Sequence, residues 1–79
     1  MTRLRIGEEV TLAELPSWVE DLPAESRAVF QFCLGRTYPV SGITDDGLVI
    51  LDVSADVDRR FGGYANDLRV EPVYLRRGP

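Results

Sequence analysis

The sequence contains no histidine, no lysine and only one cysteine, Cys33. Without histidine, no side chain has an ordinary pKa near neutrality, so the usual general base and the imidazole metal ligand are both missing. A single cysteine can form neither an intrachain disulfide nor a cysteine-rich metal cage. Cys33 stands at an apolar position of an expected helix, so we expect a buried structural thiol rather than a nucleophile. These absences predict that the protein is not an enzyme and binds no cofactor.

The chain also lacks a long apolar run. No stretch approaches the roughly 20 apolar residues that a membrane-spanning helix needs. The segment 1–10, MTRLRIGEEV, has no apolar region of the kind found in a secretory signal. We therefore expect a cytoplasmic protein with no membrane partner. A length of 79 residues predicts one small domain that covers 1–79.

Basic charge is in short supply as well, because 13 acidic residues face 9 basic ones and the net charge is −4. An acidic domain repels phosphate backbones, so we expect no nucleic-acid partner. All of the basic residues are arginine, a composition that indicates a GC-rich bacterial genome. The arginines are scattered except for the pairs Arg59-Arg60 and Arg76-Arg77, for which a solvated surface is the simplest interpretation.

The apolar pattern changes period along the first half of the chain. Residues 9–12 alternate between polar and apolar, as in a half-buried strand. From Leu15 the spacing becomes that of a helix, and Pro23 interrupts it. We expect a single turn followed by a second helix that ends at Gly35, whose freedom at positive φ suits a helix end. The helical insertion is therefore placed at about 15–35.

The second half of the chain reads as closely spaced strands. Asp46-Gly47 is a strong hairpin signal, and residues 48–53 lead away from it as a strand with one face in the core. Residues 67–71 alternate in the same way and predict the next strand. Pro72 ends that strand, so we expect one tight turn and then a short terminal strand or tail.

This order of elements resembles a Src-homology-3-like (SH3-like) small barrel. The resemblance is carried by GEEVTL, DDGLVILDV and LRVEPVYL, and the insertion LPSWVEDLPAESRAVFQFCLG is similar to that of a group of small bacterial barrel proteins. It implies a mainly β fold, a small SH3-like barrel with helices inserted between strands 1 and 2. Polyproline recognition is not expected, because helices replace the first long loop and the only tryptophan, Trp18, lies inside them.

Four polar residues alternate as they do at the start of a calcium-binding loop: Asp52, Ser54, Asp56 and Asp58. Such loops also need glycine at position 6 and a bidentate glutamate at position 12. Here these two positions hold Val57 and Gly63, so the sharp turn and the strongest ligand are missing. We therefore predict no metal site and interpret this stretch as a solvated loop between two strands.

The candidate protein-binding residues are Arg59, Arg60, Phe61 and Tyr64. Arginine and aromatic side chains are enriched in interface hot spots, and these four bracket Gly62-Gly63, where a β-hairpin is expected to project. The alternative is that Phe61 and Tyr64 belong to the core, and the sequence leaves this open. For Trp18 we expect a place in the core.

These observations predict a non-catalytic protein-interaction module. Its partner is either another protein or a second copy of the same chain. An alternative is an acidic inhibitor, such as an immunity or antitoxin protein that masks a basic site, since an acidic surface steers association with a basic one. A nucleic-acid-binding small barrel is a third interpretation, and the net charge disfavours it.

Overall fold

A computed structural model gives the structure of the chain and describes residues 4–63 and 66–78. None of the helices within these ranges is long and apolar enough to span a membrane. The strands, helices and 3₁₀ turns follow one another in the order β1 (Glu9–Leu12), η1 (Ser17–Asp21), α1 (Ala24–Cys33), β2 (Thr37–Ile43), β3 (Val49–Asp52), α2 (Ser54–Phe61), β4 (Asp67–Val70), η2 (Pro72–Tyr74) and β5 (Leu75–Arg77).

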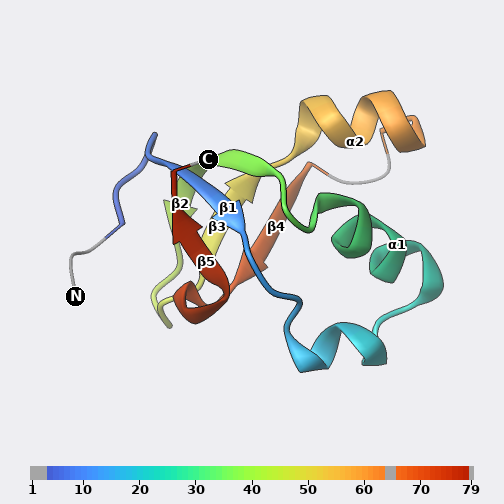
Figure 1. Cartoon of the computed structure of the whole chain (residues 1–79), viewed down its shortest axis with the longest axis horizontal. Coiled ribbons are helices and arrows are strands. Elements are labelled where there is room, and N and C mark those ends of the chain that lie inside the picture. Colours follow the sequence, from blue (N-terminus) through green and yellow to red (C-terminus); the bar gives the residue numbers. More distant parts are fainter. Residues whose placement is uncertain (1–3, 64–65, 79) are drawn as a thin grey trace.

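The strands form one antiparallel sheet in the order β4-β3-β2-β1-β5. The predicted mainly β fold is confirmed, and η1 and α1 are inserted between the first two strands as expected. The sheet is not closed into a barrel, because β4 and β5 lie at its opposite edges. In Figure 1 the helices gather on one side of the sheet, with α2 beyond one end of α1 and η1 beyond the other.

The hairpin between β2 and β3 has the predicted turn. The Thr44 N–H donates to the Leu48 carbonyl at 2.8 Å, and Gly47 adopts a φ of +89° that a side chain would strain. The register of β2 against β3 shifts between Val40 and Gly42, which marks a bulge. The extra residue bends β2, the strand that pairs with β1 on one side and β3 on the other.

Helix α1 ends where the sequence predicts. Gly35 follows it with a φ of +82°, and its N–H donates to the carbonyl of Leu12 at 2.8 Å, so the helix end is tied to β1. The buried face of α1 consists of Val29, Phe30 and Cys33. This face covers the side of the sheet that carries the apolar residues.

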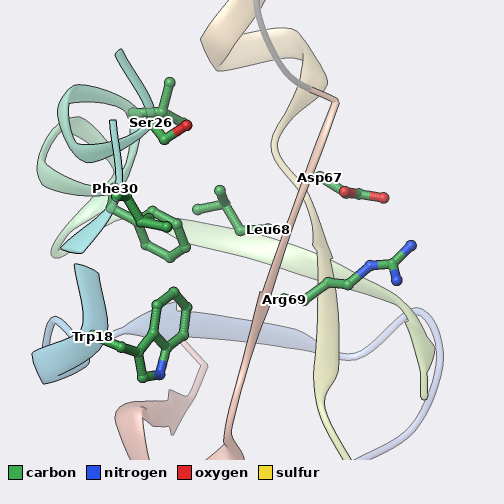
Figure 2. Close-up of a pocket in the computed structure, with 8 residues that line it drawn as sticks. Trp18, Ser26, Phe30, Asp67, Leu68 and Arg69 are labelled. Atoms are coloured by element: carbon green, nitrogen blue, oxygen red, sulfur yellow. The ribbon is translucent and has the colours of Figure 1, made fainter. Parts of the chain in front are cut away.

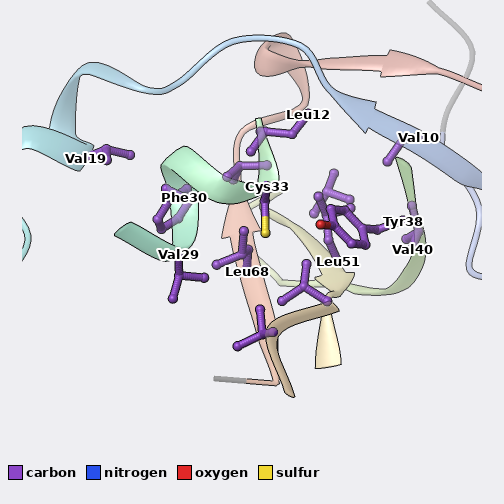
Figure 3. Close-up of a cluster of buried hydrophobic side chains, with 14 residues drawn as sticks. Val10, Leu12, Val19, Val29, Phe30, Cys33, Tyr38, Val40, Leu51 and Leu68 are labelled. Atoms are coloured by element: carbon purple, nitrogen blue, oxygen red, sulfur yellow. The ribbon is translucent and has the colours of Figure 1, made fainter. Parts of the chain in front are cut away.

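The core lies between α1 and one face of the sheet (Figure 3). Alternation along each strand supplies its residues, since side chains at every second position point to the same face. Cys33 points from α1 into this cluster and is fully buried. The buried apolar strand residues are Val10, Leu12, Tyr38, Val40, Val49, Leu51, Leu68 and Val70.

The prediction of a solvated loop over residues 52–58 is wrong, because Ser54–Phe61 forms helix α2. Val53, Val57 and Phe61 lie four residues apart and therefore on one helical face. The Asp52 carboxylate accepts one backbone donor of the first turn, because its Oδ1 accepts hydrogen bonds from the Ser54 N–H at 3.1 Å and the Ser54 hydroxyl at 2.7 Å. The alternating aspartates thus belong to a helix and its start.

Candidate functional site

The candidate residues Arg59, Arg60 and Phe61 occupy the last turn of α2 rather than the tip of a β-hairpin. The helix ends at Gly62, which adopts a φ of +76° and donates its N–H to the carbonyl of Asp58 at 3.0 Å. Glycine reaches this left-handed conformation without strain, so the chain turns away there. Tyr64 lies outside the described residues.

Phe61 is half-buried and packs against the core, and its ring meets that of Phe32 at the end of α1. The ring centroids are 5.6 Å apart and the planes meet at 90°, an edge-to-face arrangement. Such pairs contribute about 0.5–1.5 kcal/mol beyond the area that they bury. Phe61 therefore joins α2 to α1 and still leaves part of its ring at the surface.

Two arginines flank this aromatic pair. The guanidinium carbon of Arg36 lies 4.1 Å from the ring centroid of Phe32, and its Nε–H donates to the Phe32 carbonyl at 3.1 Å. The guanidinium carbon of Arg60 lies 4.9 Å from the ring centroid of Phe61. Each cation is held over an aromatic face, which attracts positive charge. We call the surface formed by Phe32, Arg36, Arg59, Arg60 and Phe61 the α1–α2 face.

The partly buried carboxylate of Asp56 connects this face to the rest of the fold. Its Oδ2 accepts a hydrogen bond from the Tyr38 hydroxyl at 2.9 Å and lies 3.6 Å from the Arg36 guanidinium. Its Oδ1 pairs with Arg59 one turn along α2. The Asp56 side chain is 19% exposed, so these interactions are less screened than those of a fully exposed pair. The carboxylate thereby ties α2 to β2 and to the segment after α1.

Burial controls the chemistry of the two titratable groups beneath the face. It raises the pKa of the Cys33 thiol above its ordinary value, and it also raises the pKa of the Tyr38 hydroxyl, with hydrogen bonds to Cys33 and Asp56 adding to the effect. Both groups therefore stay protonated at neutral pH. The expected burial of Cys33 is confirmed, and a thiol that stays protonated is a poor nucleophile.

Two carboxylates of the α2 region, those of Asp52 and Asp56, are engaged with other groups. Asp52 accepts hydrogen bonds from Ser54, and Asp56 pairs with two arginines. Over residues 4–63 and 66–78, no three His, Cys, Asp or Glu side chains come together as a metal site would require. At its surface this region presents Arg59, Arg60 and part of the Phe61 ring, together with the exposed carboxylates of Asp52 and Asp58.

A groove of about 290 Å³ lies between the helices and β4, away from the α1–α2 face (Figure 2). Trp18 forms one wall, with its ring centroid 5.4 Å from that of Phe30 and the planes at 87°. Its Nε1–H donates to the two carboxylate oxygens of Glu71 at 3.1 and 3.3 Å. Trp18 is half-buried and packs against the core at the rim of this groove.

The sequence interpretation missed Phe32 and Arg36 as members of the α1–α2 face, and it missed Asp56 as the carboxylate that pairs with its arginines. One signal was available, because Phe32 and Arg36 lie four residues apart where a helix was predicted to end. The role of Asp56 depends on Tyr38, which is distant in sequence and has no local signature. Comparison of the chain with protein-family models, with curated proteins and with solved structures found no significant match.

Proposed function

We propose that the protein is a non-catalytic protein-interaction module that contacts its partner through the α1–α2 face. The observation that carries the proposal is the row Arg36–Phe32–Phe61–Arg60. Each aromatic ring in this row has one guanidinium group over its face, and the two rings pack edge to face against each other. Arginine and aromatic residues are the types that dominate interface energetics.

This row suits recognition because its side chains are already ordered. Ordering a long side chain on binding costs about 0.5–1.5 kcal/mol, and contacts that form beforehand reduce this cost. Arg60 is exposed and has no ion pair with any residue in the described ranges, so its donors are available to a partner. A partner surface with a carboxylate beside an apolar group would match this face.

We also propose a relationship to SH3-like folds, and the strand order supports it. Chain-adjacent strands β2, β3 and β4 pair in sequence, the 3₁₀ turn η2 follows, and β5 returns to pair with β1. The same succession carried the resemblance in the sequence. Fold alone does not give function, so the interaction proposal depends on the α1–α2 face and not on this relationship.

An acidic inhibitor is the second candidate. It is favoured by the exposed acidic residues that accompany η1 and the start of α1, namely Glu14, Glu20, Asp21 and Glu25. An inhibitor of this kind would bind through these residues, and its affinity would fall steeply with added salt. Binding through the α1–α2 face depends instead on partly buried aromatic contacts and on arginine, so its affinity should fall less with added salt.

Affinity capture from the native lysate with mass spectrometry tests the proposal. The variant Arg60→Glu reverses one exposed charge of the face. The control Arg76→Glu makes the same change on the edge strand β5, which contributes no residue to this face. We expect partner yield to fall by about tenfold or more for Arg60→Glu and to stay unchanged for Arg76→Glu, with equal thermal stability of both. Equal yields from both variants would reject the α1–α2 face.

Charge variants separate the two candidate functions in the same capture. Retention of partners by Arg60→Glu, together with their loss when Glu20 and Glu25 are both changed to Gln, would favour the inhibitor. We expect the reverse pattern.

A further inference from the structure

Among the strands of residues 4–63 and 66–78, β4 is an edge strand, with one edge that pairs with no other strand. The Val53 N–H donates to the Asn66 carbonyl at 3.2 Å, so these two residues form a hydrogen-bonded pair between the chain before α2 and the start of β4. In an antiparallel ladder, hydrogen-bonded pairs alternate with pairs whose N–H and C=O groups point away from each other. The register places Leu68 opposite Leu51, so Leu68 directs its N–H and C=O toward β3. The N–H and C=O groups of Asp67 and Arg69 therefore point outward, to the open edge.

The side chains along this edge separate by face. Leu68 points toward Phe30 and the helices, whereas Asp67 and Arg69 point to the other side of β4 (Figure 2). Asp67 and Arg69 are exposed, and neither forms an ion pair with any residue that the structure describes. Asp67 also stands directly opposite Asp52 of β3, an unfavourable juxtaposition of two carboxylates.

Apolar surface borders the same edge. The groove between the helices and β4 has a volume of about 290 Å³, and it opens beside Leu68. A chain that paired with the outer edge of β4 would cover this groove. Its apolar lining comes from Trp18, Leu22, Val29, Phe30 and Leu68.

We propose that two copies of the chain associate through antiparallel pairing of their β4 edges, with Asp67 of each copy opposite Arg69 of the other. In this register the two-fold axis passes beside Leu68. Asp67 and Arg69 form hydrogen-bonded pairs across the interface, because their outward backbone groups are the ones that remain available. The two sheets then join into one, and the apolar grooves of both copies meet near the axis.

Charge complementarity selects the second copy as the occupant. The sequence Asp67-Leu68-Arg69 is self-complementary when it runs antiparallel to itself about Leu68, so opposite charges lie directly across the interface on both sides of the axis. The cation supplied to Asp67 also offsets its repulsion from Asp52. This edge is separate from the α1–α2 face, so the dimer and the proposed partner surface can be tested independently.

Sedimentation equilibrium over a dilution series tests the dimer with charge reversals at the two exposed positions. Asp67→Arg and Arg69→Asp each place like charges opposite each other in both cross-strand pairs, and we expect each variant to dissociate at least about tenfold more readily than the wild type. The double variant Asp67→Arg/Arg69→Asp restores opposite charges in the same register. We expect it to dimerise as well as the wild type, while Arg60→Glu has no effect on dimerisation.

Several outcomes would overturn the proposal. A wild-type chain that stays monomeric across the series would mean that the charges on β4 prevent edge-to-edge pairing, or that the edge binds an extended peptide instead. Single reversals that still dimerise, or a double variant that does not recover, would exclude this register. Dissociation by Arg60→Glu would move the contact to the α1–α2 face. Circular dichroism of every variant verifies that each remains folded.

Discussion

The two α-helices of this protein are held in different ways. Helix α1 has 10 residues and buries Val29, Phe30 and Cys33 against the sheet. Helix α2 has 8 residues and fully buries Val57, with Val53 buried just before its first residue and Phe61 half-buried at its end. The rest of its attachment is polar, through the carboxylates of Asp52 and Asp56.

This difference separates stability from recognition. Burying an apolar side chain stabilises a fold by about 1.5–3 kcal/mol, whereas partly exposed ion pairs and hydrogen bonds contribute about 1 kcal/mol or less each. The core that defines the fold therefore depends on α1 and the sheet. Helix α2 carries arginines at the surface and can change there without a large loss of stability.

The largest expected effect lies in α1. Phe30→Ala removes a ring that is 6% exposed and that packs against Trp18, so we expect it to lower the free energy of unfolding by about 3–5 kcal/mol. Chemical denaturation measures the change. Phe32→Ala, on the half-buried side of the same helix, serves as the matched control and should cost less than half as much. Equal losses would contradict the assignment of the core to the Phe30 side.

Helix α2 should respond less, even at its most buried position. Val57→Ala removes two methyl groups that are fully buried, and we expect a loss of about 2 kcal/mol. Val73→Ala makes the same change at a side chain that is 72% exposed, so its effect on unfolding should be within about 0.5 kcal/mol. If both variants unfold at the same denaturant concentration, α2 does not pack where the structure places it.

The polar anchor of α2 gives a smaller effect. Tyr38→Phe deletes only the hydroxyl that donates to Asp56, and we expect a loss of about 1 kcal/mol in unfolding free energy. Tyr74→Phe is the control, because no hydrogen bond to the Tyr74 hydroxyl is present among the described residues. A loss for Tyr74→Phe as large as that for Tyr38→Phe would remove the special role of Asp56.

The smallest effect is expected at the start of α2. Asp52→Ala removes the acceptor for Ser54 and should cost about 0.5–1 kcal/mol, whereas Asp45→Ala in the exposed turn should cost nothing measurable. Hydrogen bonds from the Ser54 hydroxyl and N–H lower the pKa of Asp52 in the folded state. The stability that the Asp52 carboxylate contributes is therefore fully present when the pH is above the pKa of this group in the unfolded chain. It is lost as the pH falls through the lower pKa of the group in the folded protein.

A pH titration of stability checks this sign. The difference between wild type and Asp52→Ala should shrink only below about pH 4. A difference that stays constant down to pH 2 would show that the carboxylate contributes no charge-dependent hydrogen bond.

The sheet was predictable because its signals are local. The Asp46-Gly47 turn and the alternation on both sides of it specify a hairpin from neighbouring residues alone. Helix α2 was missed because alternating aspartates suggested a loop, while its true signal is the spacing of Val53, Val57 and Phe61. That spacing gains meaning only when Phe32 and the core supply a surface to pack against, and their proximity depends on the tertiary fold.

The residues of the candidate site were likewise predictable only in part. Arg59, Arg60 and Phe61 were found from composition, since arginines beside an aromatic residue suggest recognition. Asp56 lies on the same helix, whereas Phe32 and Arg36 come from the end of α1 and the segment after it and meet α2 only in the folded chain. The sequence distance between these groups gives no sign of that contact.

Native-state hydrogen exchange tests most directly the claim that α1 belongs to the core whereas α2 is locally attached. The account predicts that amides of Phe30 and Cys33 exchange only through global unfolding. Amides of Val57 and Arg60 should exchange through a local opening that is lower by about 2 kcal/mol, because few apolar contacts hold their helix. Equal free energies of exchange for the two helices would contradict the account.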